Sequence, residues 1–199
     1  MMTLLERLRY ETQPLHLQTE TLFYTEALQN GSLSTDQYTH LLHTHLRFHR
    51  GLEEAIDLYP DFFQKYNPDT RRKADWLLAD LARLNEPISP VEPDAFRHWS
   101  PYSLLGAAYV GEGSMLGGTV IWKWLQQNPA VLPLLDQARF FRGYGPATGI
   151  NWKQFGEFLT SVGDNQPDEV VAGAKQAFTD YQTMFRALSG LCLPSPCRA

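Results

Sequence analysis

The chain is organised around one apolar stretch, Tyr109-Val110-Gly111-Glu112-Gly113-Ser114-Met115-Leu116-Gly117-Gly118-Thr119-Val120-Ile121-Trp122-Lys123-Trp124-Leu125. This stretch has the composition of a helix, yet four of the residues between positions 111 and 118 are glycines. Each glycine inside a helix costs about 0.8–1 kcal/mol relative to alanine, so four cost roughly 3–4 kcal/mol. That is a large share of the stability of a typical domain, so the missing side chains must serve a purpose.

The spacing of these glycines places three of them on or beside one face of the predicted helix. Gly113 and Gly117 are four residues apart and share one face of the helix, and Gly118 widens the bare surface. A surface without Cβ atoms allows a backbone or a flat ligand to approach closely. Two interpretations therefore stay open at this point: close packing against another helix, or a helix that lies over a planar cofactor.

The composition is that of an ordinary globular domain. The 199 residues carry a net charge of −5, from 17 basic and 22 acidic side chains, which disfavours nucleic acid or an anionic membrane as a partner. No apolar run reaches the ~20 residues of a membrane span, and the first residues lack the apolar core of a signal peptide. We therefore expect a cytoplasmic protein without a membrane span. Cys192 and Cys197, both near the end of the chain, are expected to be free thiols.

The spacing of apolar residues, prolines and capping residues predicts an all-α fold. Thr12 before Pro14 resembles an N-cap, which would kink or divide the first helix. We expect one helical domain over residues 1–190 and an irregular tail over 191–199, because no linker or repeat divides the chain. The helices are expected over about 4–30, 34–59, 68–85, 101–127, 129–137, 151–162 and 167–188.

The first predicted helix carries a histidine with a carboxylate neighbour. His16 and Glu20 are four residues apart and project from one face, and Arg9 lies two turns earlier on that face. A histidine that binds a metal usually has its second ring nitrogen held by such a group. The alternative is an ordinary surface pair, which is common on solvated helices.

The second predicted helix carries a further group of possible metal ligands. His45, His49 and Glu53 follow each other at intervals of four, a spacing that suits non-heme iron or zinc. A metal site usually needs ligands from more than one element, and no matching Glu-x-x-His motif occurs elsewhere in the chain. The alternative is a polar helix face.

Two separated motifs together resemble one family. Leu8-Arg9-Tyr10-Glu11-Thr12-Gln13-Pro14-Leu15-His16-Leu17-Gln18-Thr19-Glu20 resembles the proximal motif of the heme oxygenases, in which Thr stands four residues before the heme-binding His and Glu four residues after it. Glu112-Gly113-Ser114-Met115-Leu116-Gly117-Gly118 resembles the distal-helix motif of the bacterial members. The segments Tyr144-Gly145 and Gly149-Ile150-Asn151-Trp152-Lys153-Gln154-Phe155 are also similar to bacterial members, including those that supply bilin to phytochromes.

The resemblance implies a role for each motif residue. His16 would be the axial ligand of the heme iron, with Glu20 beside its second nitrogen. Arg9 and Lys153 match, approximately, the positions at which the family holds the heme propionates with basic residues. Arg139, Arg142 and Lys175 are further candidates for that anchor.

On the distal side, the resemblance implies that Gly113, Gly117 and Gly118 let the backbone approach the heme face. Animal members carry an Asp after the first distal glycine, where it organises water. This chain has Ser114 at that position, so we expect Ser114 and backbone groups to hold water there.

The resemblance implies a bacterial biliverdin-producing heme oxygenase with the family's helical fold. Heme would be substrate and cofactor at once, opened with O2 to biliverdin, ferrous iron and carbon monoxide. Electrons would come from an external ferredoxin or reductase, and the bilin could pass to a phytochrome. Two alternatives are kept: a non-heme diiron oxidase built on His45, His49 and Glu53, and a heme-binding or storage protein without turnover.

Overall fold

The computed structural model describes residues 2–87 and 95–189, and within these ranges every regular element is a helix. The expected all-α fold is therefore confirmed. The predicted tail at 191–199, with both cysteines, lies outside the described residues. The α-helices are α1 (Leu4–Leu22), α2 (Thr25–Gln29), α3 (Thr35–Ile56), α4 (Pro60–Phe63), α5 (Ala74–Arg83), α6 (Pro101–Leu125), α7 (Thr148–Gly163) and α8 (Pro167–Leu188), with short 3-10 turns at Gln64–Tyr66, Pro68–Thr70, Leu132–Leu134 and Gly145–Ala147.

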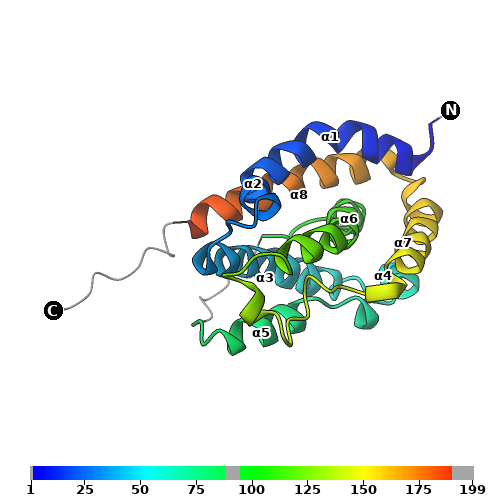
Figure 1. Cartoon of the computed structure of the whole chain (residues 1–199). Helices are drawn as coiled ribbons and strands as arrows, with labels where there is room; N and C mark the ends of the chain where they lie inside the picture. The colour runs from blue at the N-terminus through cyan, green and yellow to red at the C-terminus, as the bar shows by residue number, and fades with distance from the viewer. Residues whose placement is uncertain (1, 88–94, 190–199) are drawn as a thin grey trace.

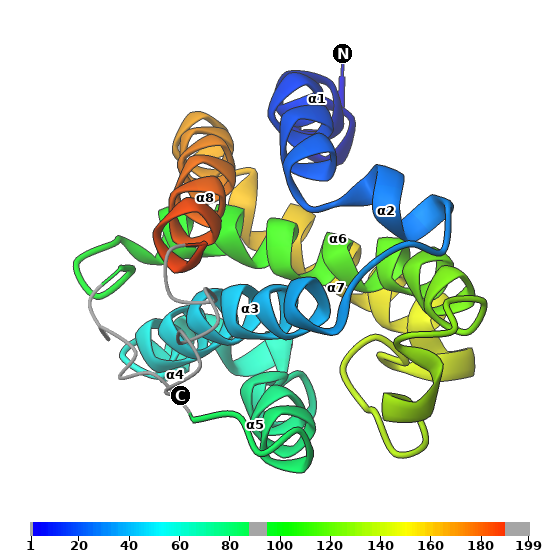
Figure 2. The same cartoon turned by 60° about the vertical axis from the view of Figure 1, so that its left-hand side comes forward.

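The glycine-bearing helix α6 runs through the middle of the domain (Figure 2). It packs most extensively against α8, and it also contacts α3 and α7. Gly106 and Gly173 make the crossing with α8 possible. A Cβ at Gly106 would lie 2.2 Å from the Val170 carbonyl oxygen, and one at Gly173 would lie 2.4 Å from the Ser103 carbonyl oxygen. The two helices can cross this closely only because both positions lack a side chain.

Helix α1 is continuous, so the N-cap predicted at Thr12 is wrong. Thr3 caps the helix instead, in a reciprocal arrangement with Glu6. Thr12 is buried in the helix interior and its hydroxyl donates to the Leu8 carbonyl at 2.8 Å. Pro14 also lies inside the helix, which accommodates a proline at this point without ending. The segment predicted as one helix over about 4–30 therefore forms two helices, α1 and the short α2.

Two other predicted elements differ from the structure. The expected helix over 129–137 is a 3-10 turn at Leu132–Leu134, and the side chain of Asn128 accepts from the amides of Ala130 and Val131 before it. Asn151 does not cap α7, because that helix already begins at Thr148. Prolines 129 and 133 and the left-handed glycines 143 and 145 keep the intervening chain irregular.

Helix α5 begins at Ala74, later than predicted, and its N-terminus is capped by another helix. The Glu53 carboxylate on α3 accepts from the amides of Lys73 at 2.6 Å and Ala74 at 3.2 Å. The basic residues 71–73 thus precede the helix and do not lie in its first turn, and the Lys73 ammonium is paired with Glu112 at 2.7 Å. In residues 2–87 and 95–189, no helix is long and apolar enough to cross a membrane.

Candidate active site

A large cavity opens between α1 and α6. It has a volume of about 1160 Å³ and is also bordered by residues of α3, α7 and α8. Seven of the eight residues that the two motifs and the Lys153 position assign to a heme site line it, and Lys153 does not. These residues are Arg9, His16, Glu20, Gly113, Ser114, Gly117 and Gly118. The structure therefore brings together two motifs that are almost one hundred positions apart in the chain.

His16 lies on the cavity side of α1, near the middle of the helix. Its Nδ1 atom is 3.6 Å from a carboxylate oxygen of Glu20, and its ring stands edge-on to Phe178 at 5.9 Å between ring centres. The side chain is 55% exposed, so the ring is accessible from the cavity. With Nδ1 turned toward Glu20, Nε2 is the nitrogen available to a metal ion or another ligand.

The glycine strip, defined as Gly113, Gly117 and Gly118, lines the cavity and is not pressed against the backbone of another helix. A Cβ at Gly117 would have no atom within 4 Å, and one at Gly118 would meet only the Phe141 carbonyl oxygen at 3.7 Å. At Gly113 the nearest atoms belong to the Trp152 ring, at 3.9 Å. The interpretation of this strip as a helix-packing surface is therefore wrong. On α6 that role belongs to Gly106.

Ser114 contributes a hydroxyl to the cavity wall, but its proton is already in use. The hydroxyl donates to the Gly111 carbonyl at 2.7 Å within the helix. The oxygen can still accept a hydrogen bond from water. Ser114 is thus suited to hold a water molecule as an acceptor, while donation from it would require breaking the contact with Gly111.

The basic residues are distributed differently from the prediction. Among the described residues that line the cavity, Arg9 is the only lysine or arginine. It lies close to Tyr109 of α6, and its positive charge and a hydrogen bond with Thr12 partly offset the rise in the Tyr109 pKa that burial causes. Lys153 does not line the cavity; its side chain is 73% exposed and its ammonium nitrogen lies 3.9 Å from a Glu157 carboxylate oxygen.

The further candidates for the basic anchor also lie outside the cavity lining. Lys175 binds Glu11 at 2.6 Å and so ties α8 to α1. The guanidinium groups of Arg139 and Arg142 stack on the rings of Trp76 and Trp122. Among the described residues, Arg9 is therefore the basic side chain that can contact a ligand in the cavity.

The His45, His49 and Glu53 stripe does not form a metal site. Within the described ranges there is no group of three or more His, Cys, Asp or Glu side chains that could hold a metal ion. Glu53 caps α5, while the rings of His45 and His49 are stacked with 6.4 Å between centres. Only His45 lines the cavity, and its Nδ1 forms a short hydrogen bond with the Tyr181 hydroxyl.

A buried charge cluster supports α6 on the side away from the cavity. Glu112 is 2% exposed and its carboxylate binds Arg71 at 2.9 Å and Lys73 at 2.7 Å. The hydroxyls of Tyr66 and Tyr144 complete its contacts at 3.0 and 3.2 Å. Burial alone would lower the pKa of Lys73, but Glu112 and the other contacts raise it overall, so the ammonium stays charged.

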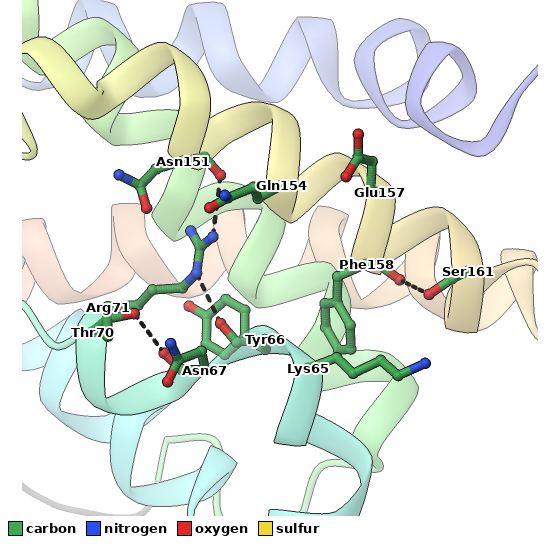
Figure 3. A pocket seen from close by; sticks show the side chains of 10 residues that line it. All are labelled: Lys65, Tyr66, Asn67, Thr70, Arg71, Asn151, Gln154, Glu157, Phe158 and Ser161. Atoms are coloured by element: carbon green, nitrogen blue, oxygen red, sulfur yellow. Dashed lines mark hydrogen bonds between the residues drawn. The ribbon is translucent and has the colours of Figure 1, made fainter.

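A second, smaller pocket of about 410 Å³ lies on the outer side of this cluster, between α7 and the two 3-10 turns after α4 (Figure 3). Arg71 spans its floor, where the guanidinium donates to the carbonyls of Tyr66 at 2.9 Å and Asn151 at 3.2 Å. The donors of Arg71 are thus occupied by protein atoms. We interpret this pocket as a surface hollow beside a structural arginine.

Several residues that shape the site are not distinguished by any local sequence pattern. Tyr109, Trp152, Phe178 and Tyr181 line the cavity, although nothing in their spacing distinguishes them from core aromatics. Arg71 and Lys73 lie near the start of the helix predicted at about 68–85, where cations are unfavourable, and this could have indicated a buried acidic partner. Their partner Glu112 lies about 40 residues later, beyond the reach of any local pattern.

These features define a class of protein: an all-helical domain in which a histidine-bearing helix and a glycine-rich helix enclose a large cavity. The chain belongs to the heme oxygenase family, whose model, described as Heme oxygenase, matches residues 2–187.

Individual relatives agree with this assignment. A protein of Xanthomonas campestris pv. campestris (strain 8004) named Heme oxygenase is 27% identical over 165 residues, which cover 81% of this chain and 96% of that protein. The heme oxygenase of Neisseria meningitidis, whose structures were solved with bound NO and CO, superposes with a TM-score of 0.78 at 22% identity, covering 98% of this chain and 96% of that one. The heme oxygenase-1 of Synechocystis sp. PCC6803, solved with heme, superposes with a TM-score of 0.77 at 18% identity, covering 96% and 94% of the two chains.

Proposed function

We propose that this protein is a heme oxygenase that opens heme to biliverdin, ferrous iron and carbon monoxide, using O2 and electrons from an external donor. The observation that carries the proposal is the cavity itself, which His16 lines from α1 and the glycine strip lines from α6. Family membership and the fold agree with it. The alternative of a diiron oxidase loses its support, because the residues assigned to it do not form a metal site.

The residues present fit heme in three respects. His16 would hold the heme iron through Nε2, while the Glu20 carboxylate lies 3.6 Å from Nδ1 on the other side of the ring. The empty space beside Gly117 is a cradle that a single Cβ would begin to fill. Arg9, two turns before His16, supplies a cation for the propionates.

Bound heme would supply the chemistry of oxygen activation, and the protein would determine how that chemistry proceeds. The glycine strip would let the α6 backbone lie close to the heme, and the polarity and steric access of this wall would then control the oxygen chemistry. The described lining carries His16 and His45 as its histidines and Arg9 as its arginine, and none of these comes from α6. The distal wall therefore offers Ser114 and backbone groups to hold water, without a strong acid or base beside the strip.

Two kinds of protein partner belong to the proposed reaction, an electron donor and an acceptor for the bilin product. An external ferredoxin or reductase would deliver electrons, and a bilin-accepting phytochrome would be one destination of the product. The relatives support the reaction class.

A reconstituted turnover assay tests the proposal. Purified protein with one equivalent of heme, O2 and an electron donor should lose its Soret band and gain the broad red absorbance of biliverdin. Carbon monoxide should be released in step with heme loss, and catalase should not prevent the reaction. Tight heme binding without turnover with several competent donors would instead identify a heme-binding or storage protein.

A further inference from the structure

The inner end of the cavity carries a polar group among aromatic rings. His45 lines the cavity from α3, and its ring is packed against Phe23, Phe140 and Phe141 with ring centres 4.7 to 5.9 Å apart. A polar atom in such surroundings is unfavourable unless it has a hydrogen-bond partner. Each ring nitrogen of His45 therefore needs a hydrogen-bond partner, either from the protein or from a ligand in the cavity.

Tyr181 fixes which nitrogen of His45 carries the proton. The Tyr181 hydroxyl bonds only to His45 Nδ1 among the described residues. Burial raises the pKa of Tyr181 well above its usual range, so the phenol stays protonated. Because Nδ1 of His45 is the acceptor within its reach among the described residues, the phenol donates to Nδ1. Burial also lowers the pKa of His45 to about 3, so the ring is neutral at pH 7. The single imidazole proton then resides on Nε2, which has no protein partner in the described structure and is available to the cavity.

This donor lies at the opposite end of the site from Arg9. Arg9 and Phe23 are each seven residues from His16 along α1, about 10 Å to either side of it. Tyr109 marks the Arg9 end, whereas Phe23 contacts both His45 and Tyr181 at the other end. A neutral histidine attracts carboxylates less than an arginine does, so propionates favour the Arg9 end.

Heme placed in this way has no acceptor for His45. The edge of the porphyrin opposite the propionates carries only methyl and vinyl groups around the α-meso carbon. Opening the ring at that carbon leaves two terminal rings that each carry a carbonyl oxygen. Those oxygens are the acceptors that an Nε2 proton at this end can use.

We propose that His45, held by Tyr181, donates a hydrogen bond to the carbonyl oxygens of biliverdin opened at the α-meso carbon, and so recognises the product in preference to heme. The inference rests on the proposed function, because it takes heme and biliverdin as the two ligands of this cavity. It makes His45 a residue that discriminates between ligands and gives Tyr181 the role of positioning it.

Equilibrium binding tests this inference without turnover. Trp124 and Trp152 line the cavity, so quenching of tryptophan fluorescence reports the binding of either ligand. In His45→Leu, the ratio of the biliverdin IXα dissociation constant to that of heme should rise about tenfold, the effect of losing one well-placed hydrogen bond. His45→Gln, which keeps an N–H donor at the end of the side chain, should restore most of the wild-type ratio.

Two further variants serve as controls. His45→Leu leaves the Tyr181 hydroxyl buried without a partner, so His45→Leu combined with Tyr181→Phe provides a second, better-satisfied protein for the same measurement. His40→Leu removes another buried histidine of α3, which binds Tyr24 and the Phe185 carbonyl and does not line the cavity. This variant should keep the wild-type ratio even if its stability falls.

The outcomes separate this inference from the proposed function. If wild-type protein does not bind heme, the proposed function fails and this inference fails with it. If both ligands bind but His45→Leu changes the two affinities equally, or changes neither, His45 does not discriminate and the inference alone is overturned.

Discussion

Gly117 and Gly106 lie on the same helix, yet alanine should act in opposite directions at the two positions. At Gly117 an added Cβ meets no atom within 4 Å. The substitution therefore gains the higher helix propensity of alanine, and we expect Gly117→Ala to stabilise the heme-free protein by about 0.4–1 kcal/mol. For a chain of this size, that corresponds to a rise in melting temperature of roughly 1–4 °C.

At Gly106 the same Cβ would lie 2.2 Å from the Val170 carbonyl oxygen and 2.5 Å from the Ala174 amide nitrogen. Both are backbone atoms, so relief requires α6 and α8 to move apart. Such overpacking typically costs about 1–3 kcal/mol, and the better propensity of alanine offsets only part of it. Gly106→Ala is therefore the matched control, with a predicted loss of stability.

At Gly117 the effect on heme affinity should be opposite to the effect on stability. The Cβ of Gly117→Ala projects into the cavity, and we expect heme affinity to fall about tenfold, a loss of about 1.4 kcal/mol. Gly117→Leu, with a longer side chain and good helix propensity, should block heme while the protein stays folded. Chemical denaturation of the heme-free proteins and Soret titration supply the two measurements. If Gly117→Ala lost stability as Gly106→Ala does, or bound heme as wild type, the assignment of the glycine strip to the heme face would be refuted.

Four further predictions concern charged and titratable groups. Glu112→Ala should lower the free energy of unfolding by about 3–5 kcal/mol, because two cations lose their buried partner, and a loss below about 1 kcal/mol in urea denaturation would contradict this. His16→Ala should fold normally but change the Soret spectrum, with recovery on adding imidazole; an unchanged spectrum would exclude it as the axial ligand. Stability should fall as pH decreases from about 6.5 toward 3, since the unfolded chain binds a proton that folded His45 excludes, and His45→Gln should reduce the slope by roughly 1.4 kcal/mol per pH unit. Arg9→Met should weaken heme binding at least several-fold while Lys153→Met leaves it near wild type, and equal losses in the two variants would return Lys153 to the site.

The part of the site that the sequence predicted rests on local periodicity. Four-residue spacing places His16 beside Glu20, and the same spacing places Gly113 and Gly117 on one face. Such relations depend only on helix geometry. Once α1 and α6 form, these side chains have fixed directions, whatever the rest of the chain does.

The parts that failed depend on contacts between distant segments. Thr12 resembles an N-cap by residue type, but a continuous α1 is stabilised by packing on α8, which no local pattern reveals. Lys73 resembles an unfavourable first-turn cation until its partner Glu112 is known. Lys153 matches a family position in sequence, yet it lies on α7 facing away from the cavity lining.

The separation of α1 from α6 would link the lifetime of this protein to the supply of any ligand that fills the cavity between them. α1 rests on α8, while the side facing α6 borders the cavity, where Tyr10, Leu17, Leu116 and Val120 line the wall and stay 37% to 69% exposed (Figure 1). A flat apolar ligand would occupy the volume that core side chains fill in other helical bundles. Ligand at a hundred times its dissociation constant adds about 2.7 kcal/mol to stability, and differences of 1–2 kcal/mol change cellular abundance several-fold. With heme as that ligand, cells short of heme would degrade the empty protein faster, and cells rich in heme would retain it.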